Sequence, residues 1–381
     1  MRHIVTLTKT DCRCGIWLGQ VWIKAIQRVG GDGSCPVFNA LEKTCNVCLT
    51  HPKYVKAIKG KKTDKKDAKW IAELFKCDLV RSSFIPPPDI RQLRDLCRYY
   101  VKLTNFVSSE KNRAQNCLTV CNFKLDDVFS DVFGKSATRV LDALLEHGNG
   151  NFELDGLLSG NCKSSPEKVR AALDGELNPM QTEKLFLIRR HMNDLSSLKA
   201  SLETLIYNLA AKFKPQIDLL LTVPGISAEL TAIRILAEIG ADMSVFETAK
   251  QLTSWAGLTP QNQESAGKKK TTRIGRAGAY LKPLLVQIAL SCGKSDKCPE
   301  LKNKYLDLKK RRGSKKAVIA IARKLLTAIW HILSKNETYN AELYRKADKP
   351  PVARELTTSQ AVAFLRGKGF VIVDAETGEV A

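Results

Sequence analysis

The spacing of apolar and polar residues divides the chain into two kinds of predicted structure. Near the N-terminus three segments carry β-branched and aromatic residues at strand-like spacing, at residues 2–8, 21–26 and 46–49. A helix is expected over 63–75. Pro86–Pro88 then end this α/β unit, because three prolines continue neither a helix nor a sheet ladder. Beyond them the predicted elements are mostly helical.

The clearest periodicity in the chain follows Pro179. One leucine-rich series recurs every seven residues and a second series is offset from it by three. The first series is Ile188, Leu195, Leu202 and Leu209, and the second is Leu198 and Leu205. Intervening positions are mostly polar, and Pro215 closes the helix. This pattern favours a coiled-coil hairpin or a dimer arm, with one amphipathic helix on a globular core as the alternative.

These patterns predict α/β structure followed by all-α structure. At about 150 residues per domain the length suits two or three domains. We expect an α/β domain at 1–84, a helical and coiled-coil region at 85–215, a compact helical domain at 216–345 and a C-terminal tail at 346–381.

The distribution of charge indicates what kind of partner the protein binds. The 381 residues include 61 Lys and Arg against 39 Asp and Glu, a net charge of +22. Residues 268–324 hold 18 Lys and Arg against three acids, and residues 53–76 hold nine Lys against three acids. Such concentration is typical of a protein that binds a phosphate backbone, with a solvated basic surface as the alternative.

The sequence disfavours membrane, secreted and zinc-binding proteins. The longest apolar stretch, 317–333, is interrupted by two cations and falls short of about 20 clean residues, so no membrane span is expected. The N-terminus lacks a signal-peptide apolar region, so the 12 Cys are expected to be reduced thiols of a cytosolic protein. Cys12-x-Cys14 and Cys45-x-x-Cys48 lack a completing pair, so no zinc is expected.

A Pro-Gly turn is a candidate phosphate site. Pro224 and Gly225 lie between an apolar helix and Thr231–Leu236, which is the layout of a helix-hairpin-helix. Backbone N–H groups at the start of the second helix can bind phosphate. Ser227 stands where many such hairpins have a second Gly, and a plain helix–helix turn is the alternative.

Two aspartates are candidate metal ligands. Asp64 and Asp67 lie three residues apart in Lys61-Lys-Thr-Asp-Lys-Lys-Asp-Ala, at an expected helix start. Their carboxylates therefore lie on one face, where they could share a divalent cation. Helix capping and interaction with the helix dipole are the alternative.

Ser265 is a candidate nucleophile. It lies in a Gly-containing stretch beside five cations, and cations stabilise the charge that develops when a hydroxyl attacks phosphorus. A merely polar loop serine is the alternative, since no His lies near it in sequence. The cations expected to bind nucleic acid here are Lys268, Lys269, Lys270, Arg273 and Arg276. Lys309, Lys310, Arg311 and Arg312 are expected to contact backbone phosphates without choosing a sequence.

Longer blocks resemble a known family. They include His51–Leu74, Ser83-Phe-Ile-Pro-Pro, Ile90-Arg-Gln-Leu-Arg-Asp-Leu, Leu236-Ala-Glu-Ile-Gly and Gln251-Leu-Thr-Ser-Trp-Ala-Gly-Leu-Thr-Pro. These blocks look like insertion-sequence transposases of the IS110 type, the DEDD transposases, over about residues 21–375. The resemblance implies a partial ribonuclease H-like (RuvC-type) N-terminal domain, a coiled-coil arm and a helical C-terminal transposase domain, which here contains the helix-hairpin-helix-like element.

The resemblance also implies chemistry and partners. Family members are recombinases that excise and insert their element, guided by a structured RNA. Four acids bind Mg²⁺ and a serine attacks DNA; the last two acids map onto Asp64 and Asp67, and the serine maps onto Ser265. The implied partners are DNA and a guide RNA. The seven-residue pattern itself favours association of copies through the coiled coil, as dimers or tetramers. The implied location is a bacterial or archaeal cytoplasm, associated with the nucleoid.

The N-terminal residues depart from the family. Gln27, in Lys24-Ala-Ile-Gln-Arg-Val-Gly30, occupies the slot of the second acid, and an amide lacks the negative charge that a hard cation needs. The first acid belongs further upstream than this chain reaches, and Asp11 has the wrong context. The pattern predicts a truncated or frameshifted copy that fails at metal-dependent cleavage. A non-catalytic DNA- or RNA-binding protein is the alternative function.

Overall fold

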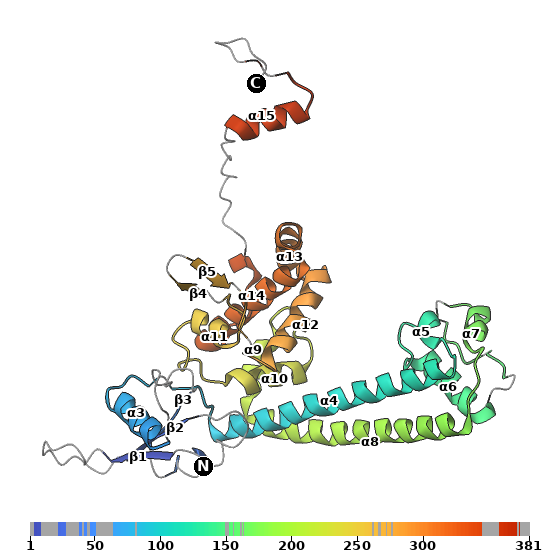
Figure 1. The fold of residues 1–381 in the computed structure, drawn as a ribbon, viewed down its shortest axis with the longest axis horizontal. Coiled ribbons are helices and arrows are strands. Elements are labelled where there is room, and N and C mark those ends of the chain that lie inside the picture. The colour runs from blue at the N-terminus through green and yellow to red at the C-terminus, as the bar shows by residue number, and fades with distance from the viewer. Residues whose placement is uncertain are drawn as a thin grey trace, which may run out of the picture.

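Figure 1 shows a computed structural model with a small strand-containing part, a helical domain and a long two-helix arm. The structure describes residues 4–8, 22–27, 38–39, 42–43, 46–50, 64–80, 82–148, 152–154, 156–160, 162, 164–260, 263–265, 268–271, 273–275, 277–344, 358–371 and 373. For strands β1, β2, β4 and β5 and for residues 64–69 it describes the backbone alone.

The N-terminal part is a three-stranded sheet with one described helix. Strand β2 (Trp22–Gln27) pairs antiparallel with β1 (Ile4–Thr8) and parallel with β3 (Asn46–Thr50). Helix α3 (Asp64–Lys76) packs against β1 and β2. Gln27 is the last residue of the central strand and lies opposite Thr50 in the register. The strands and the helix fall where the β-branched and charged patterns predict them.

The arm consists of two long antiparallel helices, α4 (Pro88–Val120) and α8 (Pro179–Ala210), which pack along their length. Each helix begins with a proline, whose fixed φ and missing N–H suit the first turn. Asn178 caps α8 by accepting a hydrogen bond from the Gln181 amide at 2.9 Å. At about 1.5 Å per residue the arm is roughly 50 Å long.

The two seven-residue series of α8 have different surroundings. Ile188, Leu195 and Leu202 of the first series are buried, whereas Leu198 and Leu205 of the second are 53% and 55% exposed. A single neighbouring helix covers only one stripe of α8, so the second series stays outside the contact with α4. The expected seam is thus half buried within one chain.

The far end of the arm carries a small helical module, here called the tip (residues 121–178). Helices α5 (Leu125–Val128), α6 (Lys135–His147) and α7 (Pro166–Ala172) enclose a second core around Phe123, Leu141 and Val169. The chain enters and leaves the tip side by side. The Lys124 amide donates to the Ala172 carbonyl at 2.9 Å, and the Glu176 amide donates to the Cys121 carbonyl at 3.0 Å.

The segment between α6 and α7 contains no helix or strand among its described residues, as its Gly, Asn and Ser content predicts. Leu154 within it is nevertheless 3% exposed and belongs to the tip core. The polar composition correctly indicates irregular backbone, but it gives no sign that Leu154 is part of the core.

The helical domain follows the arm. Its helices are α9 (Lys214–Leu221), α10 (Glu229–Ile239), α11 (Ala249–Trp255), α12 (Leu281–Lys294), α13 (Pro299–Arg312) and α14 (Ser314–Lys335). A two-stranded ribbon, β4 (Gln263–Ser265) and β5 (Lys268–Thr271), lies between α11 and α12 in sequence. One core runs from Leu93 of α4 and Ile206 of α8 into this domain.

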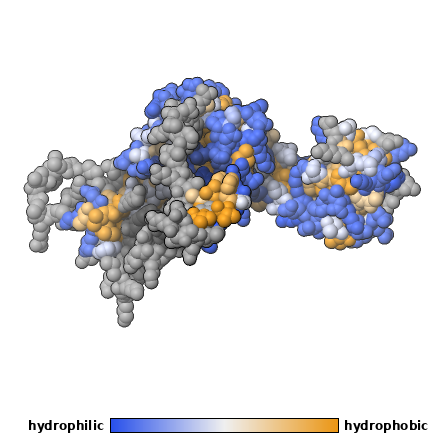
Figure 2. Space-filling model, turned by 90° about the horizontal axis from the view of Figure 1, so that it is seen from above, coloured by the Kyte–Doolittle hydropathy of each residue, from blue (hydrophilic) through white to orange (hydrophobic). Residues whose placement is uncertain are grey.

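Helix α14 is the core helix of the domain. By length and composition alone it could cross a membrane, but half of its apolar window is buried inside the protein. Ile321, Leu325 and Ile329 are buried in the core, and α9, α11, α12 and α13 pack on α14. Such burial explains its hydropathy without a membrane. Hydrophilic residues cover most of the described surface of the domain seen in Figure 2.

The C-terminal tail contains the expected short helix, α15 (Thr358–Gly367), preceded by a single 3-10 turn, η4 (Ala341–Tyr344). Helix α15 lies apart from the helical domain in Figure 1. Phe364, Leu365 and Phe370 are exposed there.

Candidate functional site

The two candidate metal ligands begin helix α3. Asp64 is its first residue and Asp67 follows one turn later, so the backbone places both on one side of the helix. Their side chains lie outside the described residues. Carboxylate oxygens are the ligands that Mg²⁺ prefers, so a first turn with two aspartates suits that ion. Within the described part of the chain, no group of three or more His, Cys, Asp or Glu could hold a metal.

Ser265 ends strand β4 of the ribbon. It lies opposite Lys268, and Glu264 lies opposite Lys269, with an irregular register between Gln263 and Glu264. Strand pairing therefore places the backbone of Ser265 beside that of the first lysine. Arg273, just beyond β5, is exposed. Arg276 and the side chains of Lys268, Lys269 and Lys270 lie outside the described residues.

The base of this ribbon is fixed by backbone contacts. Pro260 forms an isolated antiparallel bridge with Ile274, and Lys282 Nζ donates to the Gly275 carbonyl at 2.8 Å. Gly278 has φ +70°, and a Cβ there would lie 2.4 Å from the Ala256 carbonyl oxygen. Only glycine fits so close a backbone crossing. The strand that carries Ser265 thus starts from a defined position on the domain.

The Pro224-Gly225 turn joins α9 to α10, as the helix-hairpin-helix pattern predicts. Gly225 has φ +80°, and a Cβ there would lie 2.6 Å from Cys292 Sγ, so the turn sits tightly on α12. The Cys292 thiol donates to the Pro224 carbonyl at 3.2 Å. Glu229 occupies the first turn of α10 and pairs with Lys214 at 3.0 Å. A carboxylate already lies at the helix end where a phosphate would bind.

The elbow between α13 and α14 gathers the second group of cations. Lys309, Lys310, Arg311 and Arg312 end α13, Gly313 turns the chain with φ +83°, and Lys315 and Lys316 begin α14. All six cations are exposed, and no ion pair among the described residues engages them. Cations at a helix C-terminus also interact favourably with its dipole. The elbow is therefore a positively charged surface open to a polyanion.

The candidate groups come from different parts of the molecule. Helix α3 with the aspartates belongs to the N-terminal part, whereas the ribbon with Ser265 belongs to the helical domain (Figure 1). The structure brings Lys268 next to Ser265 by strand pairing and places the α13–α14 cations on a separate elbow.

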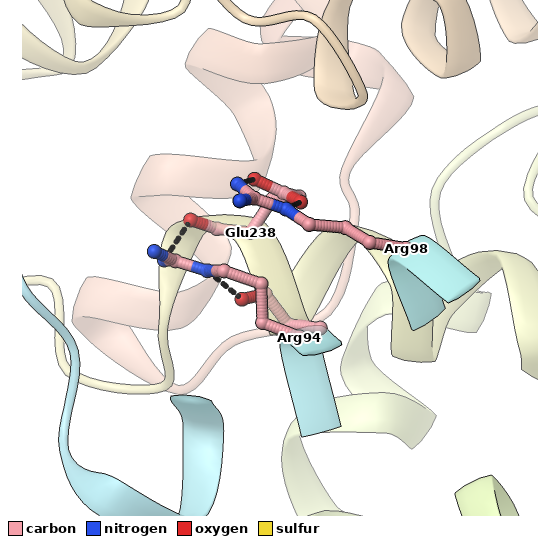
Figure 3. Close-up of polar contacts among 4 residues, drawn as sticks. Arg94, Arg98 and Glu238 are labelled. Atoms are coloured by element: carbon pink, nitrogen blue, oxygen red, sulfur yellow. Dashed lines mark hydrogen bonds and ion pairs between the residues drawn. The ribbon is translucent and has the colours of Figure 1, made fainter. Parts of the chain in front are cut away.

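Sequence reasoning missed the residues that join the arm to the helical domain. Arg98 of α4 binds Glu238 of α10 in a fork, Nε to Oε1 at 2.7 Å and Nη2 to Oε2 at 2.8 Å. Arg94 donates to the carbonyls of Ala237 and Glu238 at 2.8 and 2.7 Å (Figure 3). These donors satisfy carbonyls that the end of a helix leaves unpaired.

An aromatic cluster completes this contact. The Phe84 ring lies 5.1 Å from Phe246 and 5.7 Å from Trp255, and Arg94 lies over Phe84 at 5.5 Å. The neighbouring Ser83 amide donates to the Leu49 carbonyl of β3 at 2.6 Å. A continuous path thus links β3 to the helical domain. Two features of the sequence could have indicated this contact. One is the series of arginines at 91, 94 and 98, and the other is an acid at 238 inside an apolar block.

Burial around this contact raises the pKa of two acidic groups. Burial raises the pKa of the Cys97 thiol to about 12. Burial, together with a hydrogen bond to Glu203, raises the pKa of Tyr100 to about 12. Desolvation also lowers the pKa of Arg234, which lies near both groups and Glu238. Both the thiol and the phenol are therefore neutral at physiological pH.

Two sequence families match the chain. One, described as the Transposase IS116/IS110/IS902 family, matches residues 217–306. The other, the DEDD transposase family of IS110 elements, matches residues 20–123. The first match covers the Pro-Gly turn and the ribbon, and the second covers β2, β3, α3 and α4.

Individual relatives agree with these matches. The chain is 26% identical to a probable family 20 transposase of Pseudomonas aeruginosa over 303 residues, which are 77% of this chain and 78% of the relative. It is 33% identical over 125 residues to the transposase for insertion sequence element IS1111A of Coxiella burnetii, covering 31% of this chain and 33% of the relative. It is 30% identical over 165 residues to the pilin gene-inverting protein of Moraxella bovis, covering 41% of this chain and 48% of the relative. The chain belongs to the IS116/IS110/IS902 family of insertion-sequence transposases.

Proposed function

We propose that this transposase cleaves and rejoins DNA with Ser265 as the nucleophile and with Asp64 and Asp67 as ligands of Mg²⁺. One observation carries the proposal: the two family matches cover the two parts that contain these residues, 20–123 the aspartates and 217–306 the serine. The fold of residues 1–84 as a RuvC-like domain, and the boundaries at 84, 215 and 345, belong to the same proposal.

The chemistry follows from the ribbon. The Ser265 oxygen attacks a DNA phosphorus and loses its proton, an oxygen–phosphorus bond forms, and the bond from phosphorus to a deoxyribose oxygen breaks. That oxygen leaves with a proton, and reversal on another strand rejoins the DNA. Lys268, opposite Ser265 in the register, adds positive charge where the phosphoryl group becomes more negative. Mg²⁺ held by Asp64 and Asp67 would supply further charge stabilisation.

The nucleophile is tested by removing one oxygen. Ser265→Ala is expected to abolish strand cleavage and the covalent serine–DNA product, while DNA affinity changes less than about twofold. Ser254→Ala, at an exposed serine of α11, is the matched control and keeps both. Gel assays with labelled element-end DNA measure cleavage, and denaturing gels detect the adduct. The assignment would be contradicted if Ser265→Ala cleaved as fast as a parent chain that does cleave, either the unmodified chain or the chain carrying Gln27→Glu.

A second function, nucleic-acid binding without cleavage, is favoured by one observation. Gln27 ends the central strand, at the position where the family resemblance expects an acid. We infer that the unmodified chain cleaves DNA weakly or not at all with Mg²⁺. Gln27→Glu is expected to raise Mg²⁺-dependent cleavage at least tenfold, with Gln20→Glu as the control. Robust cleavage by the unmodified chain would exclude the binding-only function.

DNA and a guide RNA are the proposed nucleic-acid partners, in the bacterial or archaeal nucleoid. The exposed cations of the α13–α14 elbow support binding to either. Filter binding with element-end DNA, with and without RNA transcribed from the element's flanks, separates the two. Sequence-specific DNA binding that is independent of RNA would argue against a guide.

We also propose that two copies associate through α8. Met180, Leu187, Leu198 and Leu205 are all more than half exposed, and their spacings of 7, 11 and 7 residues keep them on one face. A stripe of this kind pairs readily with a second copy. Leu198→Asn with Leu205→Asn is expected to shift the mass measured by sedimentation to that of one chain. Phe186→Asn, about 100° around the helix, is the control.

A further inference from the structure

We propose that Arg98 and Glu238 are positioning residues for Ser265: together they hold the ribbon that carries it in a fixed orientation to the arm. The proposal rests on the assignment of Ser265 above. It concerns how two parts of the transposase are kept in register, which the family matches do not address.

The contact between Arg98 and Glu238 is rigid. The Glu238 side chain is 9% exposed and both of its oxygens are bound by one guanidinium. Arg94 binds the backbone carbonyls at the same end of α10 (Figure 3). Two planar forks, one on a side chain and one on the main chain, fix rotation as well as distance between α4 and α10.

A series of contacts connects the fork to the ribbon. The Arg98 guanidinium also lies over the Tyr280 ring, 4.8 Å from its centroid. Tyr280 is the N-cap residue of α12 and follows Gly278, whose backbone presses on Ala256. From the first turn of α12, Lys282 reaches back to the Gly275 carbonyl beyond β5. Arg98 therefore contacts both the end of α10 and the segment that anchors the ribbon.

Pairing with Glu238 disfavours a simpler role of Arg98 in DNA binding. Arg98 belongs to a basic helix and its side chain is 36% exposed, but its Nε and Nη2 atoms are bound to Glu238, which neutralises its charge. An ion pair with a buried carboxylate is also weak evidence for stability, because desolvation offsets much of the Coulomb attraction. Its advantage over apolar packing is the defined angle between its two planar groups.

Hydrogen exchange followed by mass spectrometry tests the proposal without substrate. In Glu238→Gln, amides of 263–271 and 273–280 are expected to exchange at least threefold faster, while those of α14 are unchanged. Arg98→Lys should act in the same direction, because an ammonium cannot bind both oxygens in a fork and stack on Tyr280. Glu110→Gln is the matched control: Glu110 is equally buried and pairs with Arg113 and His191 inside the arm. It should leave the ribbon unchanged.

Two outcomes would overturn the proposal. If the ribbon amides exchanged at an unchanged rate and only those at the end of α10 exchanged faster, the fork would be a local contact that does not position the ribbon. Faster exchange throughout, including α14, would make it a general stabiliser. Since no DNA is present, either result stands whether or not Ser265→Ala abolishes cleavage. Where cleavage is measured, the single-turnover rate of Arg98→Lys at saturating DNA should fall about tenfold with the DNA affinity unchanged.

Discussion

The tip of the arm and the helical domain are both built from short helices around a buried core, yet their charges are opposite. Residues 121–178 hold six Lys and Arg against ten Asp and Glu, whereas residues 268–324 hold 18 against three. Helix packing is indifferent to this difference, since both cores are apolar. Residues 268–324 therefore carry +15 of the net charge of +22, and this part of the helical domain is where a polyanion is expected to bind.

The two regions also differ in the size of their cores. The core of the helical domain continues into the base of the arm through Leu93 and Ile206. The core at the tip continues into the far end of the arm through Leu118 and Leu185 and is smaller, with 17 buried residues against 40 in the described chain. We expect the tip to open at a lower free energy, because smaller cores bury less apolar surface.

The largest expected effect is on DNA affinity. Replacing Lys309, Lys310, Arg311 and Arg312 together by Ala should weaken binding roughly 100-fold or more at moderate salt, and should flatten its salt dependence. The matched control replaces four exposed cations of the tip, which are Lys124, Lys135, Arg139 and Lys168. Fluorescence anisotropy at several salt concentrations measures both. An equal loss in the control would show that the charge contrast does not locate the DNA.

The next effect is on stability. Leu144→Ala in the tip and Leu326→Ala in α14 each remove a buried side chain and should cost about 2–5 kcal/mol. Only the α14 variant should also weaken DNA binding, because its cavity lies in the basic domain. Denaturant unfolding followed by circular dichroism, with binding measured in parallel, gives both results. Loss of binding in the tip variant would show that the two cores unfold as one.

A smaller effect is expected in thiol labelling. Burial raises the pKa of Cys292 to about 12, so its thiolate is scarce at pH 8 and alkylation requires local opening. In low denaturant Cys117 and Cys121, which are buried in the core at the tip end of the arm, should react before Cys292, while exposed Cys77 reacts at once. Mass spectrometry of peptides gives the order. Earlier labelling of Cys292 would reverse the predicted order of opening.

The smallest effect concerns pH. Hydrogen bonds from the Ser244 amide and hydroxyl, both 2.8 Å, lower the pKa of the Asp242 carboxyl below its usual 3.8. Its contribution to stability is therefore complete above about pH 4 and is lost as pH falls through the folded pKa. Ser244→Ala should destabilise slightly at pH 7 and less at pH 3. Ser130→Ala, in the tip, should show no such pH dependence in the same unfolding measurements.

Much of the local structure could be predicted from the sequence, because it depends on neighbours in the chain. The strands near the N-terminus, the starts of α4 and α8 at prolines, and the turn at Gly225 all follow from backbone preferences. The tip core could not be foreseen, since Leu154 lies in a polar segment and packs on residues distant in sequence.

The candidate site was predictable to a different degree. Ser265, Asp64 and Asp67 could be named from residue type and resemblance, and the structure places their backbones on a strand and a helix. The Arg98–Glu238 fork joins two residues that are 140 positions apart in the sequence, and no local sequence pattern predicts such a pair. Arginines on a basic helix suggest phosphate contacts, and only the fold shows that this one pairs with a buried glutamate.

The paired entry and exit of the tip make it separable in evolution and in design. Because Lys124 meets Ala172 and Cys121 meets Glu176, the chain could pass from α4 to α8 without the module. A loop of about two to five residues suffices for an antiparallel helix pair. Lineages could therefore gain, lose or exchange this module without rebuilding the arm, and a foreign domain could be grafted in its place.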